Sequence, residues 1–145
     1  MNGDGTSQVG CEFAYIPMLT GATEEELPLT RKRYDELAFL DEVYPLIWQD
    51  FKDEGYVTLF GEDTSAVGMF RSRLKGFKDQ PTDHYPNNYY VKAGSFESGP
   101  LLCSGSEPMY KSWFRYIKDF MREYASVPKF GLMQLARYSH EDINL

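Results

Sequence analysis

The sequence predicts an α/β protein in which a mostly parallel sheet is flanked by helices. Two observations lead to this fold class. A helical segment runs directly into a β-branched and aromatic strand at residues 56–60, and a long amphipathic segment precedes an apolar strand that begins near residue 129. Helix-to-strand steps of this kind build parallel sheets. The length of 145 residues fits one domain.

The amino-terminal part carries the weakest signals. Residues 1–24 predict loops and short turns, because glycines are mixed with scattered apolar positions. The acidic run 24–26 could open a short helix capped by Thr23, since negative charge is favourable at the amino end of a helix.

A better helix is predicted to start at Asp41. Pro45 falls in the tolerant first turn of this helix, and apolar residues follow at helical spacing. Gly55 ends the helix, and the strand 56–60 follows it at once. Residues 61–63, Gly-Glu-Asp, therefore leave the strand at its carboxyl end.

The middle of the chain changes from regular to irregular. A helix is predicted from residue 63 or 64 to Leu74, with Gly76 behind it as a left-handed stop. Residues 77–105 contain several prolines and predict a long excursion, in which His84 lies. Loops of this length are more often functional or mobile than accidental.

The clearest pattern lies near the carboxyl terminus. Ser106 is predicted to cap the longest helix, and the terminal strand begins after Pro128. We expect Phe130, Leu132 and Leu135 to be deeply buried on a central strand, so that Leu132→Ala costs about 2–5 kcal/mol. The apolar stripe of the helix consists of Met109, Trp113, Tyr116, Ile117, Phe120 and Tyr124.

Composition excludes several partners and leaves the cysteines open. The formal charge of −7 argues against nucleic acid, whose binding depends on lysines and arginines. No segment has the about 20 apolar residues that cross a bilayer, and the start of the chain does not resemble a signal peptide. Cys11 and Cys103 could be two free thiols or one disulfide.

The end of the terminal strand carries the best candidate site. Ligands of open α/β sheets bind beyond the carboxyl ends of the strands, which is where residues 139–142, Ser-His-Glu-Asp, would lie. His140 could hold a proton, an anion or a metal there, although a structural role is the common alternative. An oxygen-rich metal site would need the fold to unite its ligands, with Asp4, Thr6, Glu62, Asp63, His84, His140, Glu141 and Asp142 as candidates.

Five segments resemble a known family. They are residues 18–28, 47–51, 50–63, 76–85 and 128–145, and they occur in the family's order. Their pattern resembles an animal family of sulfatase-like proteins that is named as domain of unknown function 229. The resemblance covers nearly the whole chain.

That family is similar to the alkaline-phosphatase superfamily, whose metal-dependent members cleave or transfer phosphate and sulfate esters. The resemblance implies a three-layer sandwich with a mostly parallel sheet and a divalent metal, which would be calcium, magnesium or zinc. Sulfatases carry three similar short motifs in equivalent places. Their counterparts here are residues 19–21 (Leu-Thr-Gly), 55–58 (Gly-Tyr-Val-Thr) and 139–140 (Ser-His). His140 is thereby implied to hold the anionic ester group.

The resemblance implies further site residues. Thr6 would be the nucleophile and Asp4 a metal ligand. Glu62 stands where sulfatases carry a lysine, and its charge repels sulfate or phosphate unless a metal or an arginine lies between. Lys75 and Arg137 are the cations that we expect to compensate for this charge.

The resemblance also implies an aspartate ligand before Met1 and an Asp-His pair after Leu145. We therefore expect residues 1–145 to form a single incomplete sulfatase-like domain, inactive by itself, whose full form would act on a small anionic ester or a glycan. The alternative is a non-catalytic binding or interaction module that retains the fold. The resemblance also implies that the protein enters the secretory pathway and is located in the secretory lumen or outside the cell.

Overall fold

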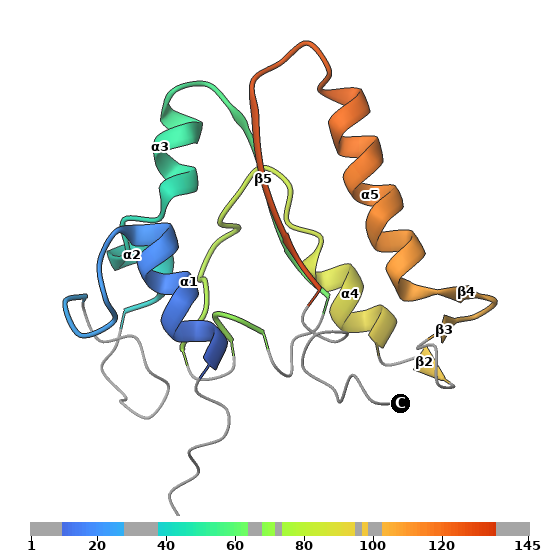
Figure 1. Ribbon diagram of the computed structural model, residues 1–145, viewed down its shortest axis with the longest axis horizontal. Helices are drawn as coiled ribbons and strands as arrows, with labels where there is room; N and C mark the ends of the chain where they lie inside the picture. Colours follow the sequence, from blue (N-terminus) through green and yellow to red (C-terminus); the bar gives the residue numbers. More distant parts are fainter. Residues whose placement is uncertain are drawn as a thin grey trace, which may run out of the picture.

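The computed structural model describes residues 10–27, 38–63, 68–71, 74–94, 97–98 and 103–135. Figure 1 shows these elements in space. Along the chain they are α1 (Gly10–Thr20), α2 (Leu40–Val43), α3 (Ile47–Asp53), β1 (Val57–Glu62), α4 (Asn87–Gly94), β2 (Glu97–Ser98), β3 (Cys103–Ser104), β4 (Glu107–Pro108), α5 (Met109–Glu123) and β5 (Lys129–Gln134).

The centre of the fold is a parallel pair of strands. β1 and β5 pair in register, with Val57 opposite Lys129 and Glu62 opposite Gln134. On its other edge β1 makes a parallel bridge between Leu59 and His84. These helices and this parallel pair confirm the α/β class. The short strands β2, β3 and β4 form a separate antiparallel sheet.

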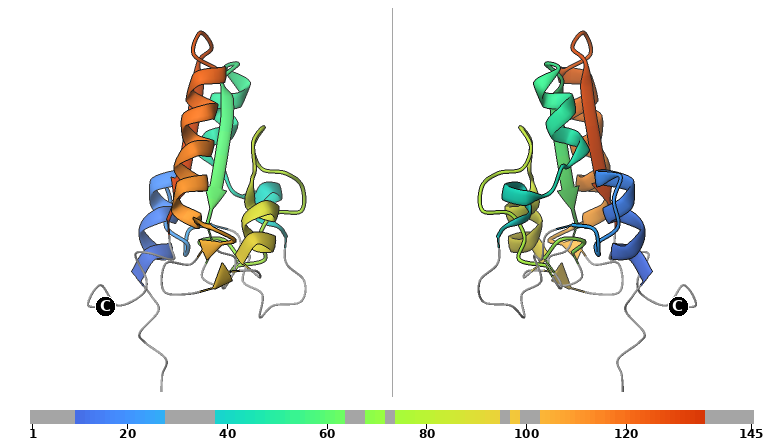
Figure 2. Two further views of the ribbon diagram at one scale, coloured as in Figure 1. Left: turned by 90° about the vertical axis from the view of Figure 1, so that its right-hand side faces the viewer. Right: turned by 90° about the vertical axis from the view of Figure 1, so that its left-hand side faces the viewer.

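Helices cover both faces of the parallel pair, as parallel strands require. Figures 1 and 2 show α1 and α3 on one side of the strands and α5 on the other. On the first face Phe51 of α3 stacks on Phe130 of β5, with ring centroids 4.4 Å apart. On the second face, Phe120 of α5 lies against Gly131.

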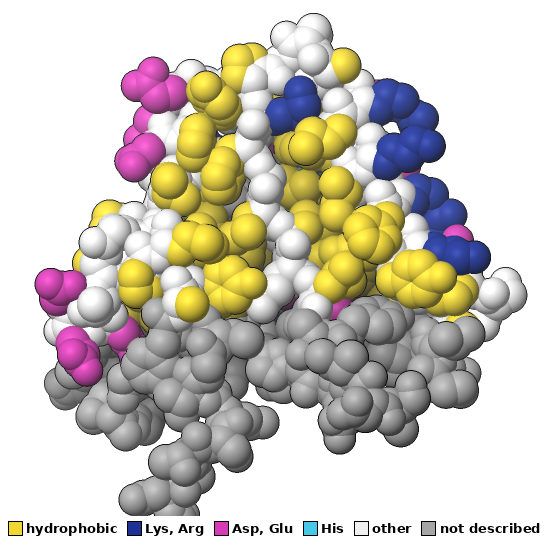
Figure 3. Space-filling model, viewed as in Figure 1, with side chains coloured by type: hydrophobic (Ala, Val, Ile, Leu, Met, Phe, Trp, Pro, Cys, Tyr) yellow, Lys and Arg dark blue, Asp and Glu magenta, His cyan; other side chains and the backbone are white. Residues whose placement is uncertain are grey.

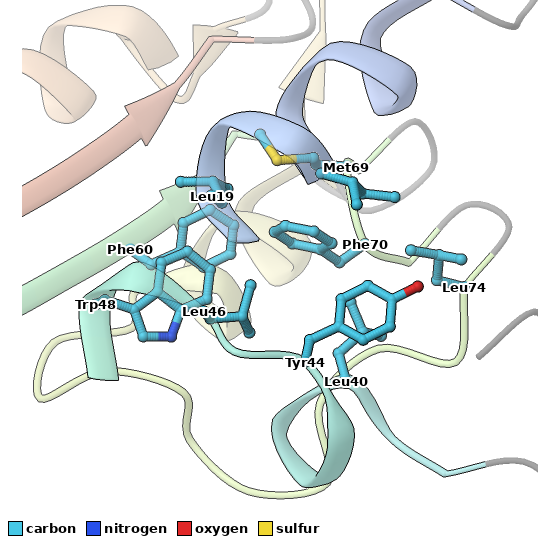
Figure 4. Close-up of a cluster of buried hydrophobic side chains, with 10 residues drawn as sticks. Leu19, Leu40, Tyr44, Leu46, Trp48, Phe60, Met69, Phe70 and Leu74 are labelled. Atoms are coloured by element: carbon cyan, nitrogen blue, oxygen red, sulfur yellow. The ribbon is translucent and has the colours of Figure 1, made fainter. Parts of the chain in front are cut away.

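The main core lies on the α1–α3 face and is rich in aromatic rings. Trp48 and Phe60 stack with centroids 5.0 Å apart, and Figure 4 shows both among aliphatic side chains from α1, α2 and the segment 68–74. Its buried members are Ile16, Leu19, Leu40, Tyr44, Leu46, Trp48, Phe60, Met69, Phe70 and Leu74.

A second core lies under α5. Trp113 is almost fully buried and meets Tyr90 of α4 edge to face at 4.4 Å. The predicted stripe of α5 is confirmed at Met109, Trp113 and Phe120, which are all buried. The helix begins at Met109 instead of Ser106, because Ser106 lies in the β3–β4 hairpin and Pro108 takes the capping position. Cys103 in that hairpin has a free thiol.

The prediction of loops and short turns over residues 1–24 was wrong for Gly10–Thr20, whereas residues 21–24 form bends and a turn as predicted. α1 occupies Gly10–Thr20 although Pro17 lies inside it. Its mostly apolar composition hides any helical period, and the helix is held instead by tertiary contacts, since Ile16 and Leu19 are buried in the main core. Gly21 ends α1 with φ of 71° and donates to the carbonyl of Pro17.

Two further helices differ from the sequence prediction. The acidic run 24–26 forms a single turn, which the Glu26 carboxylate closes by accepting from the Thr23 amide at 2.8 Å. The helix predicted from Asp41 is split into α2 and α3 around Pro45, which has no amide hydrogen to continue a helix. Gly55 does end α3, with φ of 81°.

The helix predicted up to Leu74 is absent from the described part of that segment. Gly68–Arg71 forms a turn instead, and Met69, Phe70 and Leu74 are buried in the main core. Burial of consecutive residues is incompatible with one apolar helix face, so packing overrides the helical spacing. Gly76 is left-handed as predicted, with φ of 79°.

The terminal strand is confirmed, but its predicted depth was wrong. Phe130, Leu132 and Leu135 are only half-buried, because β5 pairs with β1 alone among the described residues. Figure 3 has the same view as Figure 1, in which β5 lies in front. It shows apolar side chains on both sides of a white vertical band at the centre of the molecule. Within the part of the chain that the structure describes, β5 is thus an edge strand with apolar neighbours.

Two hydrogen bonds join the segment before His84 to β1, and an ion pair joins it to Lys52 of α3. Asp83 accepts from the amide and hydroxyl of Thr58 at 2.9 and 2.8 Å, and Lys52 lies 3.2 Å away. Burial disfavours the ionised carboxyl, but the Thr58 hydrogen bonds and Lys52 outweigh it, so the pKa of Asp83 lies below its ordinary value.

We expect Asp83 to stabilise the fold above pH of about 4, the ordinary carboxyl pKa, and to lose this contribution as pH falls through its lowered pKa. Urea unfolding of the wild type and Asp83→Asn at pH 7 and pH 3 measures the difference. The destabilisation by Asp83→Asn should be larger at pH 7. An equal loss at both pH values would contradict the lowered pKa.

Candidate functional site

The carboxyl end of the parallel pair carries buried polar side chains. Glu62 is fully buried at the last position of β1, and the buried Gln134 lies opposite it on β5. The Glu62 carboxylate accepts a hydrogen bond from the amide of Met69, which holds the turn 68–71 over the strand end. Asp63 follows, also buried, and its amide donates to the Gln134 carbonyl at 3.2 Å.

An arginine and this carboxylate both act on the same tyrosine, Tyr85. The guanidinium of Arg71 lies 5.9 Å from the centre of the Tyr85 ring. Burial raises the pKa of Tyr85 to about 12, while the charge of Arg71 lowers it and that of Glu62 raises it. Arg71 and Glu62 therefore act on the same phenol. Arg71 is thus a described cation that shares a neighbour, Tyr85, with Glu62, and sequence reasoning missed it.

The two cations proposed for this role from the sequence are not seen there. The ammonium of Lys75 lies 4.5 Å from the centre of the Phe39 ring, a cation–π contact away from the strand end. Arg137 lies outside the described residues. In the sequence, the only indication of a site role for Arg71 was that it closely follows β1. Its position in space depends on the packing of Met69 and Phe70 in the main core.

Two buried amides add hydrogen-bonding capacity near the same end. Among the described residues, both side-chain amide atoms of Asn87 and the Oε1 atom of Gln134 are buried with no hydrogen-bond partner. Asn87 starts α4 directly after Pro86, whose ring lies beside Gly61 of β1. Buried polar groups are normally paired, so these two mark a place that can take a polar ligand or water.

His84 is separated from this group. It bridges to the middle of β1, and its ring packs under α5, edge-on to Phe120 with centroids 5.4 Å apart. Its Nε2 lies 2.8 Å from the Tyr124 hydroxyl and its Nδ1 3.5 Å from that of Tyr116. The structure thus brings Glu62 and Asp63 to the strand end and places His84 elsewhere.

The other predicted site residues, Asp4, Thr6, His140, Glu141 and Asp142, lie outside the described residues. The described ranges contain no group of three histidine, cysteine, aspartate or glutamate side chains able to hold a metal ion. These residues do not by themselves form the metal centre that the family resemblance implies. The same ranges contain no helix with the length and apolarity to cross a bilayer.

An open cavity of about 570 Å³ lies beside His84, between α4 and α5. Aromatic and polar side chains line it, and sequence reasoning did not find it, although the tyrosine pair 89–90 in the long excursion was visible. The lining residues are Gln80, Asp83, His84, Tyr85, Pro86, Tyr89, Tyr90, Ser112, Arg115, Tyr116 and Asp119.

Comparison with known proteins gives one match. A family model described as "Protein of unknown function (DUF229)" matches residues 5–145. No curated protein and no solved structure matches the chain.

Proposed function

Because the chain belongs to the DUF229 family, we propose that it is part of a sulfatase-like hydrolase domain related to metal-dependent phosphate and sulfate ester hydrolases. One observation carries the proposal. β1 and β5 run parallel, and both end in buried polar side chains, Glu62 and Gln134, at the edge where α/β sheets bind their ligands. The alkaline-phosphatase-like sandwich itself is part of this proposal.

We assign the anionic ester group to this edge. His140 follows β5 by six residues in the sequence and would contact the anion, as the family resemblance implies. Arg71 supports the assignment, because its guanidinium acts on the same Tyr85 phenol as Glu62 and its positive charge opposes the negative charge that would repel sulfate or phosphate. The unpaired Nδ2 of Asn87 is a donor suited to an anion, while the unpaired Oε1 of Gln134 can accept from a hydroxyl or a water molecule.

The proposal includes a divalent metal, calcium, magnesium or zinc, and Thr6 as nucleophile with Asp4 as one ligand. Such a metal polarises an ester oxygen and lowers the pKa of a nucleophile. Since the resemblance assigns three ligands to sequence other than these 145 residues, the isolated chain should not hydrolyse 4-nitrophenyl phosphate or sulfate. Turnover that His140→Ala abolishes would overturn this part.

A non-catalytic binding module is the second candidate function. The observation that favours it is the tyrosine-lined cavity beside His84, which lies apart from the strand end and needs no metal. Only the first candidate predicts that an anion binds beside His140.

Sulfate binding tests the proposed site, because the chain has only two histidines. The chain is labelled with ¹³C-histidine and titrated with sodium sulfate at constant ionic strength, without and with magnesium. The ring signal of His140 should shift and saturate, whereas that of His84 should not move. The signal that disappears in His140→Gln identifies His140.

The outcome decides the proposal in either direction. A saturable shift confined to His140 supports an anion site at the end of the sheet. A shift confined to His84, or no saturable shift of either ring with or without magnesium, contradicts it. Far-UV circular dichroism of His140→Gln verifies that the variant is folded.

A further inference from the structure

The cavity beside His84 has the size and shape of a small-ligand site. Its volume of about 570 Å³ lies within the range of roughly 300–1,000 Å³ that is typical of ligand pockets. One wall is the α5 face of Ser112, Tyr116 and Asp119, and the other is the chain from Gln80 to Tyr90. It lies beside the middle of β1 and not at the strand end.

Two tyrosine rings in this cavity are held in place from behind. Tyr89 is 56% exposed, and its ring meets the buried Tyr90 edge to face at 4.9 Å. Tyr90 in turn contacts Trp113 in the second core. The second ring is that of Tyr116. Its hydroxyl lies 3.5 Å from His84 Nδ1, and this contact restrains the ring. Fixed aromatic surfaces bind a ligand with little loss of side-chain entropy.

The ionised groups of the lining are compensated. Asp83 pairs with Lys52 at 3.2 Å. Arg115 pairs with Glu107 at 2.6 Å, and Asp119 with Arg122 at 3.0 Å. A charged ligand would have to compete with these pairs, so the lining favours a neutral ligand that accepts and donates hydrogen bonds.

We propose that this cavity binds a neutral carbohydrate, with one pyranose ring against the exposed face of Tyr89. A pyranose has an apolar face of C–H groups and an edge of hydroxyls, which matches an aromatic ring beside polar side chains. Arg115 and Asp119 also line the cavity, and a guanidinium donates to sugar hydroxyls while a carboxylate accepts from them. Tyr85 lines this cavity and also interacts with Arg71 and Glu62, but sugar binding at Tyr89 does not require an anion at the strand end.

Saturation-transfer NMR tests the proposal with the full chain and three probes: maltose, cellobiose and N,N′-diacetylchitobiose. At least one of them should receive saturation at its ring C–H protons. Tyr89→Ala should weaken its binding about tenfold or more, the usual effect of removing an aromatic anchor. Tyr89→Phe keeps the ring face and should bind like the wild type.

Phe114→Ala is the matched control. Phe114 is 55% exposed, about as much as Tyr89, and lies on α5. It is two residues from Ser112 and from Tyr116, about 200° around the helix, so it points away from the cavity. Phe114→Ala removes a similar exposed ring and should leave sugar binding unchanged.

Three results would overturn the proposal. The first is that none of the three sugars receives saturation. The second is that Tyr89→Ala binds sugar as tightly as the wild type, and the third is that Phe114→Ala weakens binding as much as Tyr89→Ala does. Octaproline serves as a competing probe, because Pro-rich segments also bind aromatic grooves. Binding of octaproline that depends on Tyr89, in the absence of sugar binding, would assign the cavity to a peptide instead.

Discussion

Replacement of Phe60 with alanine is expected to lower the free energy of unfolding by about 3–5 kcal/mol. Phe60 is fully buried on β1 and stacks with Trp48 at 5.0 Å and with Tyr85 at 5.8 Å. Phe70 and Phe77 pack on it edge to face. Alanine leaves a cavity among large rings that cannot close without moving the main core. Urea unfolding at neutral pH measures the loss.

Leu132→Ala is the comparison for Phe60→Ala. Leu132 was predicted from the sequence to be deeply buried, but it is half-buried on the edge strand β5. Its truncation should therefore cost less than the about 2–5 kcal/mol of a fully buried leucine. Equal losses for the two variants would show that the main core does not centre on β1.

Gly61→Ala is expected to destabilise the protein by about 1–3 kcal/mol through overpacking. A Cβ atom at Gly61 would lie 2.6 Å from the sulfur of Met133 and 3.2 Å from both Pro86 and the Trp113 ring. The methionine side chain can move aside, but the proline and tryptophan rings are fixed between β1, α4 and α5. Thermal or urea unfolding measures the effect.

Gly131→Ala is the matched control, because Gly131 lies on the neighbouring strand. A Cβ atom there would meet its nearest neighbours on Leu59 and Phe120 at 3.6–3.7 Å, which is ordinary van der Waals contact. The change should be nearly neutral. A loss at Gly131 as large as at Gly61 would mean that the close approach of Pro86 and Trp113 to β1 is not the cause.

Several elements could be predicted because their signals are local. The strand after Gly55, the stripe of α5 and the strand after Pro128 all follow from spacing and breakers, and the structure confirms them. α1 was missed because its apolar residues show no period, and its stability comes from burying Ile16 and Leu19 against other segments. The predicted helix from Asp41 is split at Pro45 because proline has no backbone N–H to donate. The prediction placed Pro45 in the first turn of that helix, where the missing N–H would have been tolerated.

The candidate site divides in the same way. Glu62 and Asp63 could be placed at a strand end from the sequence alone, because they directly follow apolar strand residues. Arg71 could not, since its place over the Tyr85 ring depends on a turn whose neighbours are buried in the main core. His84 was a candidate for the same group, but it packs with tyrosines of α5 some 32–40 residues away.

The family and the α/β class were thus readable from the order of residues, because motifs and helix or strand periods are properties of neighbouring positions. Which side chains meet was decided only in three dimensions. The pairing of β1 with β5 joins segments about 70 residues apart, and the tyrosine cavity joins α4 to α5. Such contacts depend on how several elements pack together, and no local pattern encodes that packing.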